Sequence, residues 1–237
     1  MTVSYSSCNQ CEVKSKSKFQ CLNQNNLATI DSAKVNAEYR KGDYLFRKGE
    51  KIAGFYCMNA GSVRTFIAAE AKRKEYSFGI LFPGDWVGWR DAILGEVFNH
   101  SAVCLENTKA CFVAKDTILN LMDEEVNFQR ELLFQMAREW ERSEKQAYSL
   151  GTKQIHSKLA ELLITFYHVS DTIPTIELKV TREVMASMIG TTTESVIRAL
   201  SDFKVREWIS LEKSKIVVFD YDSLFALSKI NEKEVLV

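Results

Sequence analysis

The sequence lacks any long uncharged apolar run, and it contains only two prolines and three histidines in 237 residues. A membrane-spanning helix needs about 18 to 20 consecutive apolar residues, so the chain is not expected to cross a bilayer. Its first twenty residues are polar, without the apolar stretch that directs secretion, which predicts a cytoplasmic protein. The three histidines lie far apart, and no nucleophile elbow, phosphate loop or metalloprotease motif occurs, so an enzyme is not expected.

The sequence also has no excess of either charge, since 31 basic side chains balance 31 acidic ones. From Leu150 onward, acidic residues slightly outnumber basic ones. Because DNA-binding proteins commonly carry a basic excess, this balance counts mildly against nucleic acid as a partner. A DNA-binding function would therefore depend on a small, oriented basic face and would have modest nonspecific affinity.

The composition that is present belongs to an ordinary globular protein. Hydrophobic residues make up 46% of the chain and charged residues 26%, enough for a real core in one large domain or two modest ones. The six cysteines occur without an export signal, which argues against a disulfide framework. They are better interpreted as free thiols or metal ligands.

Glycine is concentrated in one stretch, because eight of the ten glycines fall between Gly42 and Gly95. Short aromatic and β-branched runs separate them, which predicts antiparallel strands joined by glycine turns in a barrel or sandwich. The predicted strands cover residues 55–58, 63–67, 76–81, 101–106 and 110–113. We assign residues 27–126 to this β domain and residues 1–26 to a cysteine-containing N-terminal segment.

A long amphipathic helix is predicted over residues 127–150. Apolar residues recur along it at spacings of three and four, at Phe128, Leu132, Met136, Trp140, Ala147 and Leu150. This narrow stripe with charged flanks resembles a coiled-coil seam. The helix could pack on its own domain or pair with the same helix of a second copy, and its place between two domains favours pairing. Gly151 interrupts the pattern and predicts a hinge.

A helix-turn-helix is predicted within the C-terminal part of the chain, residues 151–237. Thr181 can cap a short helix that runs to Ile189, and Gly190 follows where a tight turn needs an unrestrained backbone. A second helix is predicted to begin within residues 191–194. Two short helices around a glycine turn are typical of the helix-turn-helix, whose second helix enters the major groove of DNA.

Two further features frame this motif. An amphipathic helix is predicted over residues 155–167, before a loop that contains Pro174. After the motif, residues 209–211 and 216–219 have the pattern of short strands on either side of a polar turn. This hairpin is predicted to be the wing of a winged helix-turn-helix.

The stretch from Thr181 to Phe219 resembles the C-terminal domain of the CRP/FNR family of bacterial regulators, most clearly in the core IGTTTESVIRAL. Similar phrases continue through the glycine-rich region, so the resemblance covers about Leu27 to Leu227. It implies an α+β fold with an N-terminal double-stranded, jelly-roll-like β-roll, a long dimerisation helix and a C-terminal winged helix-turn-helix. It also implies a homodimer whose partners are a double-stranded DNA operator and RNA polymerase.

The resemblance implies base-reading residues as well. In this family a Glu and an Arg four residues later read base edges, and the matching residues are Glu194 and Arg198. Their chemistry agrees, because Arg donates two hydrogen bonds to guanine and Glu accepts one from cytosine N4. Two structural roles are the alternatives: a capping box between Thr191 and Glu194, or a simple surface pair one helical turn apart. The complete motif around the two residues favours base readout.

Four other residues of this segment are expected near DNA. Ile197 stands where the family is expected to have a small or polar residue, and it would contact a thymine methyl group or alter the operator sequence. Thr192, Thr193 and Lys215 are candidates for phosphate contacts.

The β-roll carries a degenerate ligand pocket by the same resemblance. Cyclic-AMP-binding members of the family place a Glu on the ribose after the glycine that matches Gly88, and an Arg on the cyclic phosphate within an Arg-Ser-Ala sequence. The matching positions here are Trp89 and His100, the latter followed by Ser101. A neutral imidazole is a poor replacement for a fixed guanidinium on a phosphate, so cyclic AMP is not expected to bind.

The cysteines resemble those of FNR-type oxygen sensors, in which three N-terminal cysteines and one in the β-roll hold a [4Fe–4S] cluster. The matching set is Cys8, Cys11, Cys21 and Cys111. Four thiolates suffice for such a cluster. Nine residues separate Cys11 from Cys21, more than the family spacing, and the polar stretch from Lys14 to Lys18 within them is expected to be flexible.

Other interpretations of the cysteines stay open. Cys8-x-x-Cys11 could be incidental, a zinc site or a thiol redox pair. Cys57, Cys104 and Cys111 lie in strand-like runs, where cysteine behaves as a small buried apolar residue. The β-roll would then have no cofactor or would take an unknown small ligand.

Together these features predict a homodimeric, sequence-specific transcription regulator. A signal sensed in the β-roll would alter the packing of the long helix and reorient two recognition helices on half-sites about one DNA turn apart. The alternative is a cyclic-nucleotide-type ligand-binding module whose C-terminal domain mediates protein contacts, which the neutral charge of that domain supports.

Overall fold

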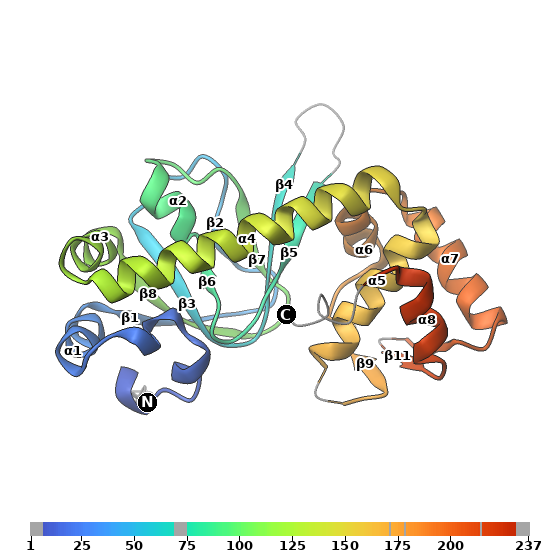
Figure 1. Cartoon of the computed structure of the whole chain (residues 1–237), viewed down its shortest axis with the longest axis horizontal. Helices are drawn as coiled ribbons and strands as arrows, with labels where there is room; N and C mark the ends of the chain where they lie inside the picture. The colour runs from blue at the N-terminus through green and yellow to red at the C-terminus, as the bar shows by residue number, and fades with distance from the viewer. Residues whose placement is uncertain (1–6, 69–74, 171, 178, 214, 231–237) are drawn as a thin grey trace. The chain divides into compact units, whose positions relative to one another are not determined.

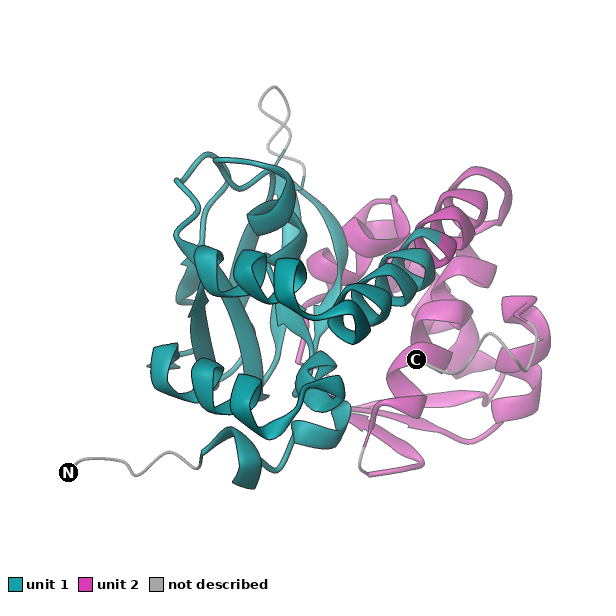
Figure 2. Cartoon of the chain, turned by 60° about the vertical axis from the view of Figure 1, so that its left-hand side comes forward, with its two compact units in different colours: residues 1–140 teal, residues 141–237 magenta. Residues whose placement is uncertain are grey.

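The computed structural model describes residues 7–68, 75–170, 172–177, 179–213 and 215–230 (Figure 1). The chain divides into two compact units, residues 1–140 and residues 141–237 (Figure 2). Residues 1–6 of the predicted N-terminal segment and residues 231–237 of the predicted C-terminal domain lie outside the described residues. Among the described helices, none is both long and apolar enough to cross a lipid bilayer.

Two four-stranded antiparallel sheets form the β-roll of the first unit, in the orders β1-β8-β3-β6 and β2-β7-β4-β5. Their strands are β1 (Val35–Tyr39), β2 (Tyr44–Phe46), β3 (Gly54–Ala60), β4 (Val63–Ala68), β5 (Glu75–Leu81), β6 (Trp86–Val87), β7 (Ser101–Cys104) and β8 (Thr108–Ala114). The strands predicted between residues 55 and 113 are confirmed, as is the antiparallel roll. Glycine turns set its corners, since Gly42, Gly49, Gly61 and Gly84 all have positive φ.

Short helices cover one end of the roll, and the sequence analysis did not predict them. They are α1 (Gln24–Ala33), α2 (Trp89–Leu94), α3 (Lys115–Glu124) and the 3-10 turns η1 (Cys8–Gln10), η2 (Lys14–Lys16) and η3 (Lys18–Cys21). The stretch from Lys14 to Lys18, expected to be flexible, forms η2 and the start of η3, and Ser17 and Lys18 are buried. Phe19 is buried, with its ring centroid 4.4 Å from that of Trp86, and this contact fixes the chain on the roll.

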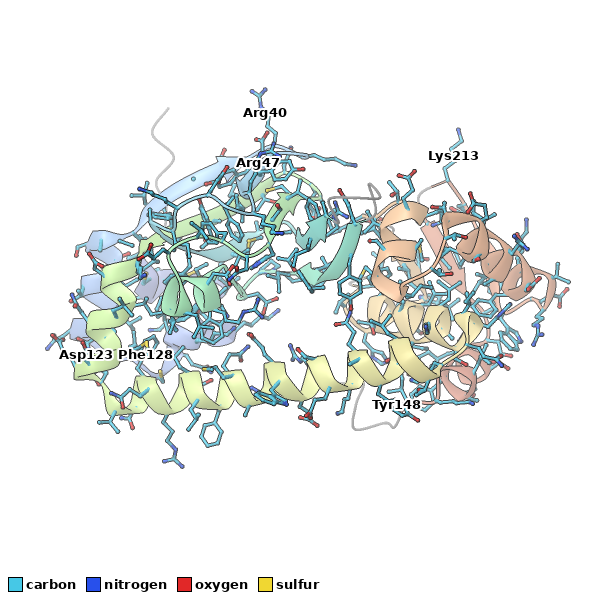
Figure 3. All side chains as sticks on the ribbon, turned by 90° about the horizontal axis from the view of Figure 1, so that it is seen from above. Arg40, Arg47, Asp123, Phe128, Tyr148 and Lys213 are labelled. Atoms are coloured by element: carbon cyan, nitrogen blue, oxygen red, sulfur yellow. The ribbon has the colours of Figure 1, made fainter. Side chains whose placement is uncertain are left out.

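Helix α4 (Val126–Thr152) confirms the predicted long helix, but Gly151 lies inside its last turn and does not interrupt it. Two residues of the predicted seam face inward instead. Phe128 and Leu132 are buried in the core of the β-roll unit. The Phe128 ring (Figure 3) lies against those of Phe19 and Trp86. They are therefore not available to a second copy of the helix, and their place in the predicted dimer seam is wrong.

The second unit is the predicted winged helix-turn-helix. Its helices are α5 (Ile155–His168), α6 (Arg182–Ile189), α7 (Thr193–Val205) and α8 (Tyr221–Ser228), and its strands are β9 (Thr175–Glu177), β10 (Ile209–Leu211) and β11 (Lys215–Val218). Helix α5 contacts α6, α7 and α8. The predicted wing hairpin is confirmed as β10 and β11, and β9 adds a third strand that the sequence analysis did not predict.

Candidate nucleic-acid interface and sensory site

The turn between α6 and α7 is built by three local contacts. The hydroxyl of Thr181 accepts a hydrogen bond from the Val184 amide at 3.3 Å and caps α6, as predicted. Gly190 ends this helix with φ +65°, a left-handed conformation that favours glycine. The Thr192 hydroxyl then accepts from the Ser195 amide at 3.2 Å and begins α7. The first turn of α7 therefore has a fixed direction.

Helix α7 has one buried face and one exposed face. The buried face carries Val196, Ala199, Leu200 and Phe203. On the other side Glu194, Ile197 and Arg198 are exposed, with Ile197 at 50% of its full accessibility. The spacing of three and four residues brings these exposed side chains together on one face of the helix. The two charged groups predicted to read bases thus stand side by side on the surface.

The structure supports neither structural alternative for Glu194, the capping box with Thr191 or the surface ion pair with Arg198. The cap of α7 is Thr192 and not Thr191, so the capping box between Thr191 and Glu194 does not form. Within the described residues, neither Glu194 nor Arg198 takes part in an ion pair. Hydrogen bonds from its own backbone amide and from the Thr192 hydroxyl lower the pKa of Glu194, and the nearby Arg198 charge adds to this. Glu194 is therefore an ionised acceptor at neutral pH.

The other predicted contact residues differ in their accessibility. Thr192 is exposed and Thr193 is half-buried. The Lys215 ammonium lies 3.4 Å from the Glu177 carboxylate on the neighbouring strand, so part of its charge is already balanced. Lys213, in the turn of the wing, is exposed and projects outward (Figure 3). Sequence reasoning missed Lys213, although its place in a polar wing turn was a usable signal.

The predicted ligand-pocket residues of the β-roll are occupied by contacts within the protein. Trp89 is buried in the hydrophobic core. A side chain on Gly88 would collide with Phe46 and Phe98, whose rings stack with centroids 3.7 Å apart. The Ser101 hydroxyl accepts a hydrogen bond from the Lys48 amide at 3.0 Å.

His100 is engaged as well. Its Nδ1 lies 2.9 Å from Oδ2 of the buried Asp91. Burial opposes ionisation of Asp91, but the neighbouring His100 ring and a hydrogen bond from the Asn99 amide outweigh burial and keep the pKa of Asp91 below its ordinary value. His100 therefore lies beside a carboxylate, whereas the phosphate of a cyclic nucleotide would need a cation at this position.

A small cavity in the β-roll unit gathers cysteine side chains. It has a volume of about 30 Å³, and Cys8, Cys11, Cys57 and Cys111 line it together with Lys34 and Asn59. Cys21 lies elsewhere, where its thiol donates to the Lys18 carbonyl oxygen at 3.3 Å. The structure therefore unites three of the four predicted cluster cysteines and adds Cys57. No sequence signal identified Cys57, because its role depends on strand register.

The two units correspond to two known domain families. Residues 37–125 match the cyclic nucleotide-binding domain family, and residues 157–227 match the Crp-like helix-turn-helix domain family. The chain belongs to the CRP/FNR family of transcription regulators. The family assignment inferred from the sequence is confirmed, and DNA-binding transcription regulation is the function of this chain.

Relatives of this CRP/FNR regulator share its length at low identity. The transcriptional activator protein anr of Pseudomonas aeruginosa is 24% identical over 193 residues, which cover 80% of this chain and 78% of that protein. The fumarate and nitrate reduction regulatory protein of Vibrio cholerae is 21% identical over 234 residues, covering 95% and 92%. The structure of FixK2 from Bradyrhizobium japonicum matches with a TM-score of 0.76 at 21% identity, covering 84% of this chain and 98% of that one. At this identity the structural likeness shows the fold alone.

The cysteine set of the FNR-type sensors does not fit this regulator in the predicted form. Cys21 is outside the cavity that Cys8, Cys11 and Cys111 line. Within the part of the chain that the structure describes, no group of three or more His, Cys, Asp or Glu residues is arranged to hold a metal ion. A [4Fe–4S] cluster on Cys8, Cys11, Cys21 and Cys111 is therefore not supported by this arrangement.

Proposed function

We propose that this CRP/FNR regulator is a homodimer that recognises a two-fold symmetric operator through α7, with Glu194 and Arg198 reading base edges. The observation that carries the proposal is the exposed face of α7, where a carboxylate and a guanidinium without ion-pair partners among the described residues lie one turn apart. Arg198 would donate a bidentate pair to guanine, and Glu194 would accept from cytosine N4. Between them, Ile197 offers an apolar contact to a thymine methyl group.

Phosphate contacts would come from the ends of the same unit. The exposed Thr192 hydroxyl lies at the N-terminus of α7, where helix geometry favours anions. Lys213 at the wing turn supplies a positive charge, with the partly balanced Lys215 beside it and Thr193 as a weaker contact. Since these few groups would make the phosphate contacts, the unit would need no overall excess of basic residues to bind DNA.

The Arg198→Ala variant tests base readout. Loss of one bidentate contact costs about 1–3 kcal/mol, so affinity for the preferred operator should fall about 5- to 150-fold per half-site, while affinity for random DNA changes little. Gel-shift titrations with operators selected from a random library measure both affinities. Lys204→Ala is the charge-matched control on the same helix, and it should leave the ratio of specific to random binding unchanged.

Two outcomes would count against the proposal. Equal losses on operator and random DNA would make Arg198 a phosphate contact and not a base reader. Failure of the parent protein to bind any selected operator would favour the alternative of a ligand-binding module whose C-terminal domain contacts protein.

The dimer would pair along a corrected seam on α4. Val126, Leu133, Trp140 and Ala147 recur every seven residues and are exposed, and Met136 lies between them on the same side. A seven-residue apolar repeat on a long helix is the pattern of a two-stranded coiled coil. Phe128 and Leu132 occupy a different face, and Leu150 lies half-buried near Gly190. We infer that the five exposed residues, and not the buried pair, hold the dimer, which would present two α7 helices to DNA and bring the regulator to RNA polymerase.

Cyclic AMP should have no effect on this regulator. The pocket positions are occupied by the Phe46–Phe98 stack and by the His100–Asp91 pair, which leaves no guanidinium for the cyclic phosphate. Thermal unfolding with and without millimolar cyclic AMP measures this directly, because a ligand at a hundredfold excess over Kd stabilises by about 2.7 kcal/mol. A rise in Tm that grows with cyclic AMP concentration would show that the pocket still binds.

A further inference from the structure

The second compact unit begins inside α4, because residues 141–152 of this helix belong to the unit that carries the helix-turn-helix (Figure 2). Two residues, Lys153 and Gln154, join α4 to α5, since α4 ends at Thr152 and α5 begins at Ile155. Connections this short between two helices adopt few conformations. The junction therefore restricts the direction of α4 relative to α5.

A largely buried polar network fixes this junction. The Lys153 side chain is 10% exposed, and its ammonium lies 3.0 Å from Oε2 of Glu161 on α5. The same ammonium donates to the Ser228 carbonyl oxygen at the end of α8, at 2.8 Å. The Ser149 hydroxyl of α4 donates to Oε2 of Glu161 at 2.7 Å. One carboxylate oxygen thus joins the end of α4 and the junction to α5, and Lys153 adds α8.

Leu150 makes two further contacts at the end of α4. Its carbonyl oxygen accepts a hydrogen bond from the Lys158 ammonium at 2.7 Å. A cation is favourable there, because the last carbonyl groups of a helix lack partners within it and carry partial negative charge. The Leu150 side chain lies beside the turn between α6 and α7, since a Cβ atom on Gly190 would be 3.2 Å from Leu150 Cδ2. The end of α4 therefore contacts the helix-turn-helix directly.

Helix α5 connects the junction to the recognition helix. Nε2 of His156, in the first turn of α5, lies 2.8 Å from Oδ2 of Asp202 on α7. The His156 ring also packs against Phe203, with ring centroids 5.7 Å apart. Phe203 is fully buried. The last turns of α4 are thus linked to α7 through packed and hydrogen-bonded side chains.

We infer that Lys153 is a positioning residue for DNA binding, which holds the end of α4, α5 and α7 as one rigid group. The inference rests on the proposed homodimer, in which the two α4 helices pair. With a rigid junction, the α4 pair sets both the separation and the rotation of the two α7 helices. The regulator then reads its half-sites at one spacing, because each added base pair moves a half-site by about 3.4 Å and turns it by about 34–36°.

The first test measures how operator affinity depends on the spacing of the half-sites. Two linked binding sites gain about 10²–10⁴ in affinity, and this gain is lost where the geometry forbids simultaneous contact. The parent should therefore bind its selected operator at least about a hundredfold more tightly than the same operator lengthened by two base pairs. In Lys153→Met this ratio should fall by about tenfold or more, because a loosened junction weakens binding at the optimal spacing and tolerates the wrong one. Both affinities come from one protein preparation, so the ratio does not depend on the fraction of folded protein.

Lys145→Met is the matched control. It removes the same charge from α4 and breaks the ion pair of Lys145 with Glu141 at 2.9 Å, but that pair is exposed and lies within one helix. Its spacing ratio should equal that of the parent. If Lys153→Met does not fold, Glu161→Gln takes its place, since it removes the partner charge and keeps a side-chain oxygen for the Ser149 hydroxyl.

Hydrogen exchange of the free protein tests the junction without DNA. In Lys153→Met the amides of residues 149–158 should exchange faster than in the parent, while those of α7 keep the parent's rates. Equal acceleration throughout the second unit would show a general loss of stability and would overturn the inference, as would an unchanged spacing ratio. A parent protein that binds its operator without any spacing preference would refute the proposed homodimer, and the exchange rates would then decide by themselves whether Lys153 fixes the junction.

Discussion

Replacing Phe128 by alanine should destabilise the β-roll unit by about 3–5 kcal/mol, the usual cost of removing a buried phenylalanine side chain. Phe128 is fully buried, and its ring lies 6.3 Å from that of Phe19 and 6.1 Å from that of Trp86. The same substitution would loosen the N-terminal segment, because Phe19 holds that segment on the roll. Urea unfolding followed by tryptophan fluorescence should show a midpoint at lower urea concentration, with Trp86 as the nearest reporter.

Phe134→Ala is the matched control for this experiment. Phe134 lies on the same helix but is exposed, so its removal should cost less than about 1 kcal/mol. Equal destabilisation by the two substitutions would contradict the assignment of Phe128 to the core and would restore it to the predicted dimer seam.

Introducing an acid at the centre of the proposed seam, by Leu133→Glu, should dissociate the dimer. In a symmetric pair the substitution places two like charges across the helix contact and removes two leucines that the proposed dimer would bury. Like charges facing each other across an interface cost several kcal/mol, which corresponds to more than about a hundredfold in the dimer dissociation constant. Sedimentation velocity over a range of concentrations measures this constant, and operator affinity should fall with it because a single α7 reads only half a site.

Phe134→Glu provides the control on the neighbouring face of α4. It introduces the same charge next to the seam repeat but not within it, so the dimer should persist. If both variants remained dimeric, another surface would hold the dimer. If the parent protein were monomeric at all concentrations, the pairing proposal would fail.

Sequence reasoning predicted the helix-turn-helix better than the arrangement of the cysteines in the β-roll unit. The helix-turn-helix depends on local signals, since the cap at Thr181, the left-handed Gly190 and the apolar spacing of α7 all act within a few residues. These signals place Glu194 and Arg198 on the exposed face without knowledge of distant contacts. The helix cap is Thr192 and not Thr191, so α7 begins one residue later than the capping-box alternative required. A difference of one residue is the usual uncertainty at a helix end.

The cysteine site depends on contacts between residues far apart in the chain. Cys57 and Cys111 are 54 residues apart, and only the register of β3 on β8 sets them opposite each other. A shift of that register by one residue would turn one of the two side chains to the other face of the sheet. The resemblance to FNR-type sensors indicated Cys21 and not Cys57, because a sequence comparison follows the spacing of cysteines along the chain. It cannot show how the packing of Phe19 anchors the N-terminal segment.

The sequence alone determined the order of elements, the antiparallel character of the glycine-rich half, the long helix and the exposed face of α7. These follow from periodicity, turn residues and caps, which are short-range properties of the chain. Tertiary structure alone decided which stripe of α4 is buried, which groups occupy the nucleotide pocket positions and which cysteines meet. A helix with apolar residues on more than one face presents several possible contact surfaces, and only the shape of the neighbouring core selects among them.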